Sequence, residues 1–400
     1  MTAPHPPRPK APAFDVDALL DSPSTRIIVC CGSGGVGKTT SAAALGLRAA
    51  ERGRDTVVIT VDPARRLAQS MGLRRLDNTP RPVPLASGDD GARQRPPGTL
   101  HAMMLDMKRT FDEIVEAHAD PERARQILAN PFYQSLSSSF SGTQEYMAME
   151  KLGQLRQSGD WDLIIVDTPP SRSALDFLDA PKRLGRFLDG RLLKILSAPA
   201  KSGAFRLIGA GVGMVTGVIS KIVGAQVLKD VQTFVTAFDA VFGGFQERAE
   251  QTYRLLQAPG TAFVVVAAPD PDALREASYF IERLNEDRMP LAGVVVNRTH
   301  RTAVQQLSAA RSLAAAEALD ESGDHALAAS ALRLHAERTQ VQAREIRLRE
   351  HLTSAHPGVP IVEVPARPED VHDLDGLREI GEALGTGGTR QGAGGERVSG

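Results

Sequence analysis

The chain has 400 residues, of which 42% are apolar, 24% are charged and 4% are aromatic, with a formal net charge of −1. This length suits either two average domains or one large α/β domain with insertions. The balanced charge and the scarcity of aromatic residues give no basic surface and no base-stacking platform, so we expect neither nucleic acid nor an anionic membrane surface as a partner. The two cysteines, Cys30 and Cys31, are neighbours in an expected strand, where they point to opposite faces. They therefore cannot pair with each other, and they offer no zinc-binding spacing.

Short apolar runs alternate with helical patterns over residues 23–385. Because several of these runs are continuously apolar, we expect strands that are covered on both faces. This pattern predicts an α/β fold in a single domain, with a doubly wound, mostly parallel sheet. Residues 1–22 are expected to form a flexible leader and residues 386–400 a disordered tail. The first twelve residues are proline-rich and lack the apolar core of a signal peptide, which predicts a cytoplasmic protein. The expected strands are 26–31, 56–61, 100–105, 162–166, 262–268, 292–296 and 360–364.

Helical insertions interrupt this alternation at about 107–157 and 173–258, and a helical hairpin is expected over about 301–352. Within the second insertion, residues 207–220 are uncharged and strongly apolar, with glycines four residues apart. Such a segment either forms an exposed hydrophobic surface or packs closely against another helix. It is too short to span a bilayer, so we do not expect an integral membrane protein.

A glycine-rich loop directly follows the first expected strand. Residues 32–39 match G-x-x-x-x-G-K-T between a strand and a helix. Glycines let successive backbone N–H groups point at phosphate oxygens, and the helix that follows presents its positive N-terminus to the same anion. Lys38 is expected to reach the β- and γ-phosphates and Thr39 to ligate Mg²⁺, so we predict a nucleoside triphosphate ligand. The expected phosphate-loop residues are Gly32, Ser33, Gly34, Gly35, Val36, Gly37, Lys38, Thr39 and Thr40.

Polar residues end three other expected strands, where ligands of open α/β sheets collect. Asp62 follows one strand, Asp167 ends a second, and Asn297 ends a third. An aspartate at a strand tip is often only a helix N-cap, and for Asp62 alone that alternative stays open. Next to a phosphate loop, Asp62 is a candidate for orienting the attacking water, and Asp167 for holding Mg²⁺ through water. The amide of Asn297 can pair with the donor and acceptor of adenine.

The ordered motifs G-x-G-G-V-G-K-T-T, V-D-P-A, V-D-T-P-P and V-V-N resemble those of the deviant-Walker P-loop ATPases. Within them the chain is similar to the ArsA-like arsenite-pump branch, which includes the eukaryotic ATPase that targets tail-anchored membrane proteins, and most of all to its actinobacterial members. The resemblance covers most of residues 26–385 and implies ATP and Mg²⁺ as cofactors. It implies that Asp62 is the catalytic aspartate of the first switch, that Asp167 opens the second switch, and that Asn297 reads adenine. It also places Pro365 and Arg367 in the loop that covers the base, and the helical insertions in a client-binding subdomain.

The chain departs from the family at two points. The second loop residue, normally a lysine that reaches into the partner subunit's site, is Ser33. The resemblance implies a dimer, and this change leaves open a homodimer or a heterodimer with a lysine-bearing paralogue. A nearby arginine such as Arg65 is the other candidate for the missing charge. The cysteines that bind arsenite or a zinc clasp in relatives have no counterpart, so we expect neither ligand.

These observations predict a Mg²⁺-dependent ATPase that uses ATP to switch conformation for a hydrophobic client or partner protein. In this prediction Asp62 and Lys38 are the catalytic residues, and Thr39, Asp62 and Asp167 hold the metal, partly through water. Two alternatives remain. A membrane- or DNA-positioning ATPase needs a basic patch or a C-terminal amphipathic helix. A metabolic ligase or kinase fits the long helical insertions poorly.

Overall fold

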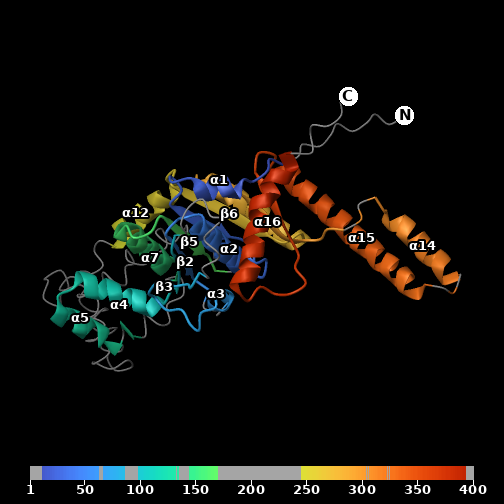
Figure 1. Ribbon diagram of the computed structural model, residues 1–400. Coiled ribbons are helices and arrows are strands. Elements are labelled where there is room, and N and C mark those ends of the chain that lie inside the picture. The colour runs from blue at the N-terminus through green and yellow to red at the C-terminus, as the bar shows by residue number, and fades with distance from the viewer. Residues whose placement is uncertain are drawn as a thin grey trace, which may run out of the picture. The chain divides into compact units, whose positions relative to one another are not determined.

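The computed structural model describes residues 11–62, 66–85, 98–131, 133–134, 144–169, 245–302, 304, 306–321, 323 and 325–392. An eight-stranded sheet with the strand order β3-β4-β2-β5-β1-β6-β7-β8 dominates it (Figure 1). The pairs β1–β5, β1–β6, β2–β5, β6–β7 and β7–β8 are parallel, which confirms the expected α/β P-loop fold. The strands are β1 (Ile27–Cys31), β2 (Thr56–Thr60), β3 (Arg81–Pro82), β4 (Leu100–Met104), β5 (Leu163–Asp167), β6 (Thr261–Ala267), β7 (Leu291–Thr299) and β8 (Ile361–Pro365).

The central strands are buried along their whole length, as their continuously apolar sequences require. Helix α2 (Lys38–Glu51) contacts β1, β2, β5 and α16 (Leu374–Gly392), whereas α13 (Pro271–Glu286) contacts β6 and β7. From β1 the chain continues to β2 on one side of the sheet and later to β6, β7 and β8 on the other. This reversal is the topological switch point, and the carboxyl ends of the parallel strands meet there at one edge.

Two of the expected boundaries are wrong. Residues 11–22, assigned to a flexible leader, are part of the sheet unit: Ala13 bridges to Ile361, and α1 (Val16–Asp21) buries Val16 and Leu20. Their few apolar side chains are spaced for one helix face, a signal that the proline content of the preceding residues obscures. Helix α16 runs to Gly392, into the segment assigned to the tail, and the short antiparallel strand β3 at the sheet edge was not expected.

The chain divides into two compact units, and the second comprises residues 104–159 and 175–255. In it α4 (Met107–His118) packs against α5 (Pro121–Leu128) and α7 (Gln144–Ser158). The phenol of Tyr133 donates to Asp112 Oδ1 at 2.7 Å, and Lys151 pairs with Glu113 at 3.0 Å. Of the second insertion only α12 (Phe245–Gln257) is described, so the apolar segment 207–220 lies outside the described residues. None of the helices in the described ranges has the length and apolar composition that crossing a membrane requires.

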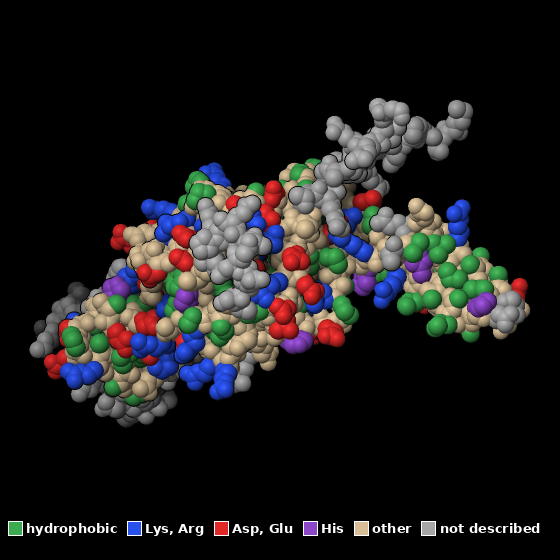
Figure 2. All heavy atoms as spheres, viewed as in Figure 1, with side chains coloured by type: hydrophobic (Ala, Val, Ile, Leu, Met, Phe, Trp, Pro, Cys, Tyr) green, Lys and Arg blue, Asp and Glu red, His purple; other side chains and the backbone are tan. Residues whose placement is uncertain are grey.

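Helices α14 (Ala309–Glu321) and α15 (Ala326–Ala355) form an antiparallel hairpin within the sheet unit (Figure 1). Two contacts attach α15 to the residue that follows β7. Glu345 Oε2 accepts the backbone N–H of His300 at 2.8 Å, and Glu345 Oε1 lies 2.6 Å from His300 Nδ1. The hairpin leaves several large apolar side chains exposed, among them Leu327 and Leu334 (Figure 2).

Candidate nucleotide site

The phosphate loop has the backbone that its glycines permit. Gly35 and Gly37 have φ angles of +77° and +96°, values that favour glycine, and Gly37 caps the N-terminus of α2. A Cβ on Gly32 would lie 2.0 Å from the carbonyl oxygen of Val266 in β6, so only glycine lets the loop pack on that strand. The ammonium group of Lys38 donates to the carbonyl oxygen of Ser33 at 2.7 Å, which curls the lysine back over its own loop. Burial lowers the pKa of Lys38, while the neighbouring Asp167 carboxylate acts in the opposite direction.

Asp167 lies fully buried at the end of β5, and only one of its two carboxylate oxygens accepts hydrogen bonds from described residues. Its Oδ2 accepts the hydroxyls of Thr39 and Thr60, each at 2.8 Å. Its Oδ1 is buried without a hydrogen-bond partner among the described residues. Burial raises the pKa of Asp167 to about 6, against the effect of the two hydroxyl donors. A buried carboxylate oxygen beside a threonine hydroxyl is the donor set that a hydrated Mg²⁺ accepts, so these residues fit the metal.

The backbone of Asp62 is held by Thr60, a residue that the motifs did not single out. The backbone N–H of Asp62 donates to Thr60 Oγ1 at 3.2 Å, and the same hydroxyl donates to Asp167. One threonine therefore ties together the two acidic residues of the site. Thr60 and Asp167 are register partners in the neighbouring strands β2 and β5, so their side chains lie on the same face of the sheet, and no pattern in the sequence of β2 alone indicates this.

Asn297 and Arg298, at the end of β7, hold the phosphate loop from the other side. Asn297 Nδ2 donates to the carbonyl oxygen of Val36 at 2.8 Å, and Arg298 Nη1 donates to that of Gly35 at 3.1 Å. The amide of Asn297 lies so close to Gly37 that a Cβ there would approach its Nδ2 to 2.2 Å. Asn297 thus supports the loop, whatever else it contacts.

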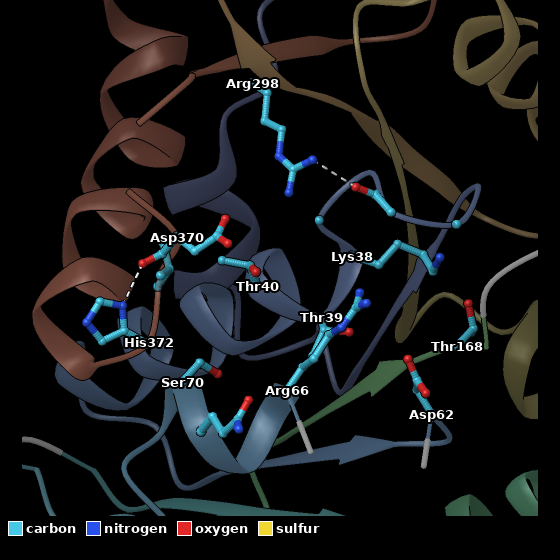
Figure 3. A pocket seen from close by; sticks show the side chains of 15 residues that line it. Lys38, Thr39, Thr40, Asp62, Arg66, Ser70, Thr168, Arg298, Asp370 and His372 are labelled. Atoms are coloured by element: carbon cyan, nitrogen blue, oxygen red, sulfur yellow. Dashed lines mark hydrogen bonds between the residues drawn. The ribbon is translucent and has the colours of Figure 1, made fainter. Parts of the chain in front are cut away.

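These elements enclose a cavity of about 900 Å³ (Figure 3). Its wall consists of the phosphate loop and the start of α2, of Asp62 and α3 (Arg66–Ser70), and of Thr168, Arg298 and residues 370–372. Lys38, Asp62 and Thr168 lie at one end, and Asp370 and His372 lie toward the other. Asp167 and Asn297 stand behind this wall and contact it through Thr39 and the loop carbonyls.

The segment after β8 contributes different residues from those expected. Neither Pro365 nor Arg367 lines the cavity. Pro365 pairs with Thr299 in the sheet, and Arg367 forms an ion pair with Glu379 of α16. Instead Asp370, Val371 and His372, a few residues further along, reach the cavity. The position of this turn depends on how α16 docks, which no local pattern encodes.

The structure also places Ser33 and the two cysteines. Ser33 Oγ is buried and has no hydrogen-bond partner among the described residues, so the loop does not use the hydroxyl internally. Cys30 and Cys31 are buried in β1. Burial raises the pKa of the Cys30 thiol well above its usual value and that of Cys31 to about 12, so neither presents a thiolate near neutral pH.

A mostly parallel sheet with a glycine-rich loop at its switch point, a buried lysine and two linked carboxylates defines a P-loop nucleotide-binding protein. The family model described as Anion-transporting ATPase matches residues 25–355. The chain therefore belongs to this ArsA-like family and is an ATP hydrolase.

Curated relatives carry ATPase names. The chain is 26% identical over 286 residues to the ATPase GET3 of Podospora anserina, an alignment that covers 71% of this chain and 76% of that protein. It is 26% identical over 283 residues to the ATPase ASNA1 homolog of Cryptosporidium parvum, covering 70% and 67%. It is 29% identical over 170 residues to the ATPase GET3 of Malassezia globosa, covering 42% of this chain and 46% of that protein.

Proposed function

We propose that the chain is a Mg²⁺-dependent, cytoplasmic ATPase that couples ATP hydrolysis to a conformational switch acting on a hydrophobic client or partner protein. The observation that carries the proposal is that the phosphate loop and Asp62 line one cavity, with the buried Asp167 bonded to Thr39 directly behind its wall. Thr39 and Asp167 would hold Mg²⁺, partly through water, with Asp62 nearby. When bound there, the metal supplies positive charge to the β- and γ-phosphates.

The described residues divide the remaining chemistry among themselves. The loop N–H groups and Lys38 bind the phosphates and stabilise the charge that develops on them. Asp62 orients the water that attacks the γ-phosphate, with its backbone held by Thr60. Asn297 Nδ2 is occupied by the loop, so Asn297 Oδ1 is the atom that accepts the 6-amino group of adenine.

Mutation of two loop-proximal residues separates binding from hydrolysis. Lys38→Ala should lose most of its affinity for ATP, whereas Asp62→Asn should bind ATP and hydrolyse it at least about a hundredfold more slowly. Calorimetry measures the first effect and phosphate release the second. Arg275→Ala, on the exposed surface of α13, is a matched control that should change neither. Turnover by Asp62→Asn at the wild-type rate would show that the role given to Asp62 is wrong.

The switch and its client follow from the resemblance and from the helical insertions. Asp167 ends the strand that precedes residues 173–258, so a change at the γ-phosphate reaches that insertion along the chain. The uncharged segment 207–220 supplies the apolar surface in this proposal. The Asp62→Asn variant, loaded with ATP, should retain a client in a pull-down from cell extract, and Lys38→Ala should not. Amides of 203–228 that exchange equally in every nucleotide state would assign this segment to rigid core and exclude the client surface.

Ser33 raises the question of the partner. In the dimer that the resemblance implies, the loop lysine supplies positive charge to the opposite site, and serine is too short and uncharged for this. A cation supplied in trans is worth about 10³-fold or more in rate where it is an arginine finger. We therefore favour a heterodimer with a paralogue that retains the lysine, in which this chain's own site is the competent one.

The test of the heterodimer compares ATP hydrolysis by three preparations: the chain alone, its Ser33→Lys variant, and a mixture with a lysine-bearing paralogue. Ser33→Lys and the mixture should each hydrolyse ATP faster than the wild-type chain alone. Full activity of the isolated wild-type chain, unchanged by the partner, would exclude the proposed heterodimer.

We also propose that neither zinc nor arsenite is a ligand, because both thiols are buried and protonated. Stoichiometric zinc in the purified protein, or stimulation by arsenite, would contradict this.

A further inference from the structure

Arg298 has an unusual backbone conformation at the edge of the nucleotide cavity. Its φ angle is +61°, in the left-handed region that residues other than glycine rarely adopt. The pairing of β7 with β8 shifts register between Asn297 and Thr299, so Arg298 occupies a bulge. A bulge with a left-handed residue costs free energy and typically re-aims a side chain beside a functional site.

The bulge has a specific geometric result. In a regular strand, neighbouring side chains point to opposite faces, so Asn297 and Arg298 would diverge. Here both donate to the same loop, Asn297 to the carbonyl of Val36 at 2.8 Å and Arg298 to that of Gly35 at 3.1 Å. In Figure 3 the dashed line from the Arg298 guanidinium marks its hydrogen bond to the carbonyl oxygen of Gly35, and both residues line the cavity.

The positive charge of Arg298 has no carboxylate partner among the described residues. Its side chain is exposed, and none of the described carboxylates forms an ion pair with it. One hydrogen bond to a neutral carbonyl fixes one edge of the guanidinium, and the side chain lies on the wall of the cavity.

We propose that Arg298 is a nucleotide-binding residue that stacks its guanidinium plane on the adenine base. The inference rests on the proposed function, in which Asn297 meets the edge of the base. A side chain that starts one residue later and ends at Gly35 passes over the face of a base held at Asn297. Guanidinium is planar and weakly hydrated and stacks well on aromatic faces, which an ammonium does not. In this arrangement the bound base and the loop carbonyl hold Arg298 from two sides.

The test compares nucleotides with a phosphate chain that has no base. Calorimetric titrations in Mg²⁺ use ATP, ADP and inorganic tripolyphosphate, on the full chain and on Arg298→Asn. Asparagine tolerates the left-handed backbone, so the variant removes the guanidinium without adding strain. Arg288→Asn is a matched control, because Arg288 also has a positive φ, +56°, but does not line the cavity. Thermal unfolding followed by tryptophan fluorescence confirms that each variant is folded.

Arg298→Asn should weaken ATP and ADP binding by similar factors of about tenfold and leave tripolyphosphate binding within about twofold of wild type. Arg288→Asn should change none of the three. Wild-type affinity for ATP in Arg298→Asn would overturn this inference and leave the proposed function standing. So would an equal loss for ATP and tripolyphosphate, because Arg298 would then act through the phosphates or the loop. A wild-type chain that binds no ATP would overturn the proposed function as well.

Discussion

Thr60→Val tests whether the hydroxyl that joins the two carboxylates of the site matters as the structure indicates. The Thr60 side chain is buried, donates to Asp167 Oδ2 at 2.8 Å and accepts the backbone N–H of Asp62 at 3.2 Å. Valine has nearly the same shape and lacks the hydroxyl. The substitution therefore removes a hydrogen bond to a buried carboxylate and leaves the N–H of Asp62 without this acceptor.

The expected loss of stability follows from the type of bond. A hydrogen bond to a charged group contributes about 1.5–3 kcal/mol, so Thr60→Val should lower the free energy of unfolding by about 2 kcal/mol. Thr56→Val is a matched control on the same strand, because Thr56 is equally buried and donates to a neutral carbonyl, that of Arg54, at 3.1 Å. It should cost about 1 kcal/mol. Turnover should fall about tenfold only in Thr60→Val, because a small misplacement of Asp62 misaligns the attacking water.

The assay uses a reporter that the chain supplies. Trp161 is the single tryptophan, lies just before β5, and stacks edge-on against His101 with a centroid distance of 4.7 Å. Its fluorescence during urea unfolding therefore reports on the sheet unit. At pH 8, above the raised pKa of Asp167 of about 6, the carboxylate is ionised and the charged hydrogen bond is intact. Equal losses of stability in Thr60→Val and Thr56→Val, or wild-type turnover in Thr60→Val, would refute the reasoning.

Three further substitutions test other contacts. Gly32→Ala places a Cβ 2.0 Å from the carbonyl oxygen of Val266, so the loop must shift and ATP affinity should fall more than about tenfold by calorimetry; wild-type affinity would contradict this packing. Arg54→Met removes donors to four backbone carbonyls and should lower the free energy of unfolding in urea by about 3 kcal/mol, whereas a loss under about 1 kcal/mol would show that water replaces the guanidinium. Glu345→Ala removes both bonds to His300 and should raise amide exchange in α15 about tenfold or more; unchanged protection would mean that α15 is held by other contacts.

The sequence by itself determined the class of fold and the phosphate end of the site. Continuous apolar runs specify buried parallel strands, and G-x-x-x-x-G-K-T is recognisable from a short stretch, because the glycines and the helix that follows are neighbours in the chain. The positions of Asp62, Asp167 and Asn297 after strands were enough to predict that they converge, since parallel strands end at one edge.

Only the tertiary structure decided how the rest of the cavity is built. Thr60 became important because β2 and β5 are neighbours, and the order of strands in a sheet is not a local property. Arg298 reaches the loop because of a one-residue register shift, and such a shift reverses the face on which a side chain lies. Arg367 was expected at the base but pairs with Glu379, because the docking of α16 sets the path of the turn after β8. Local pattern thus specifies which elements form, while long-range packing selects the side chains that meet.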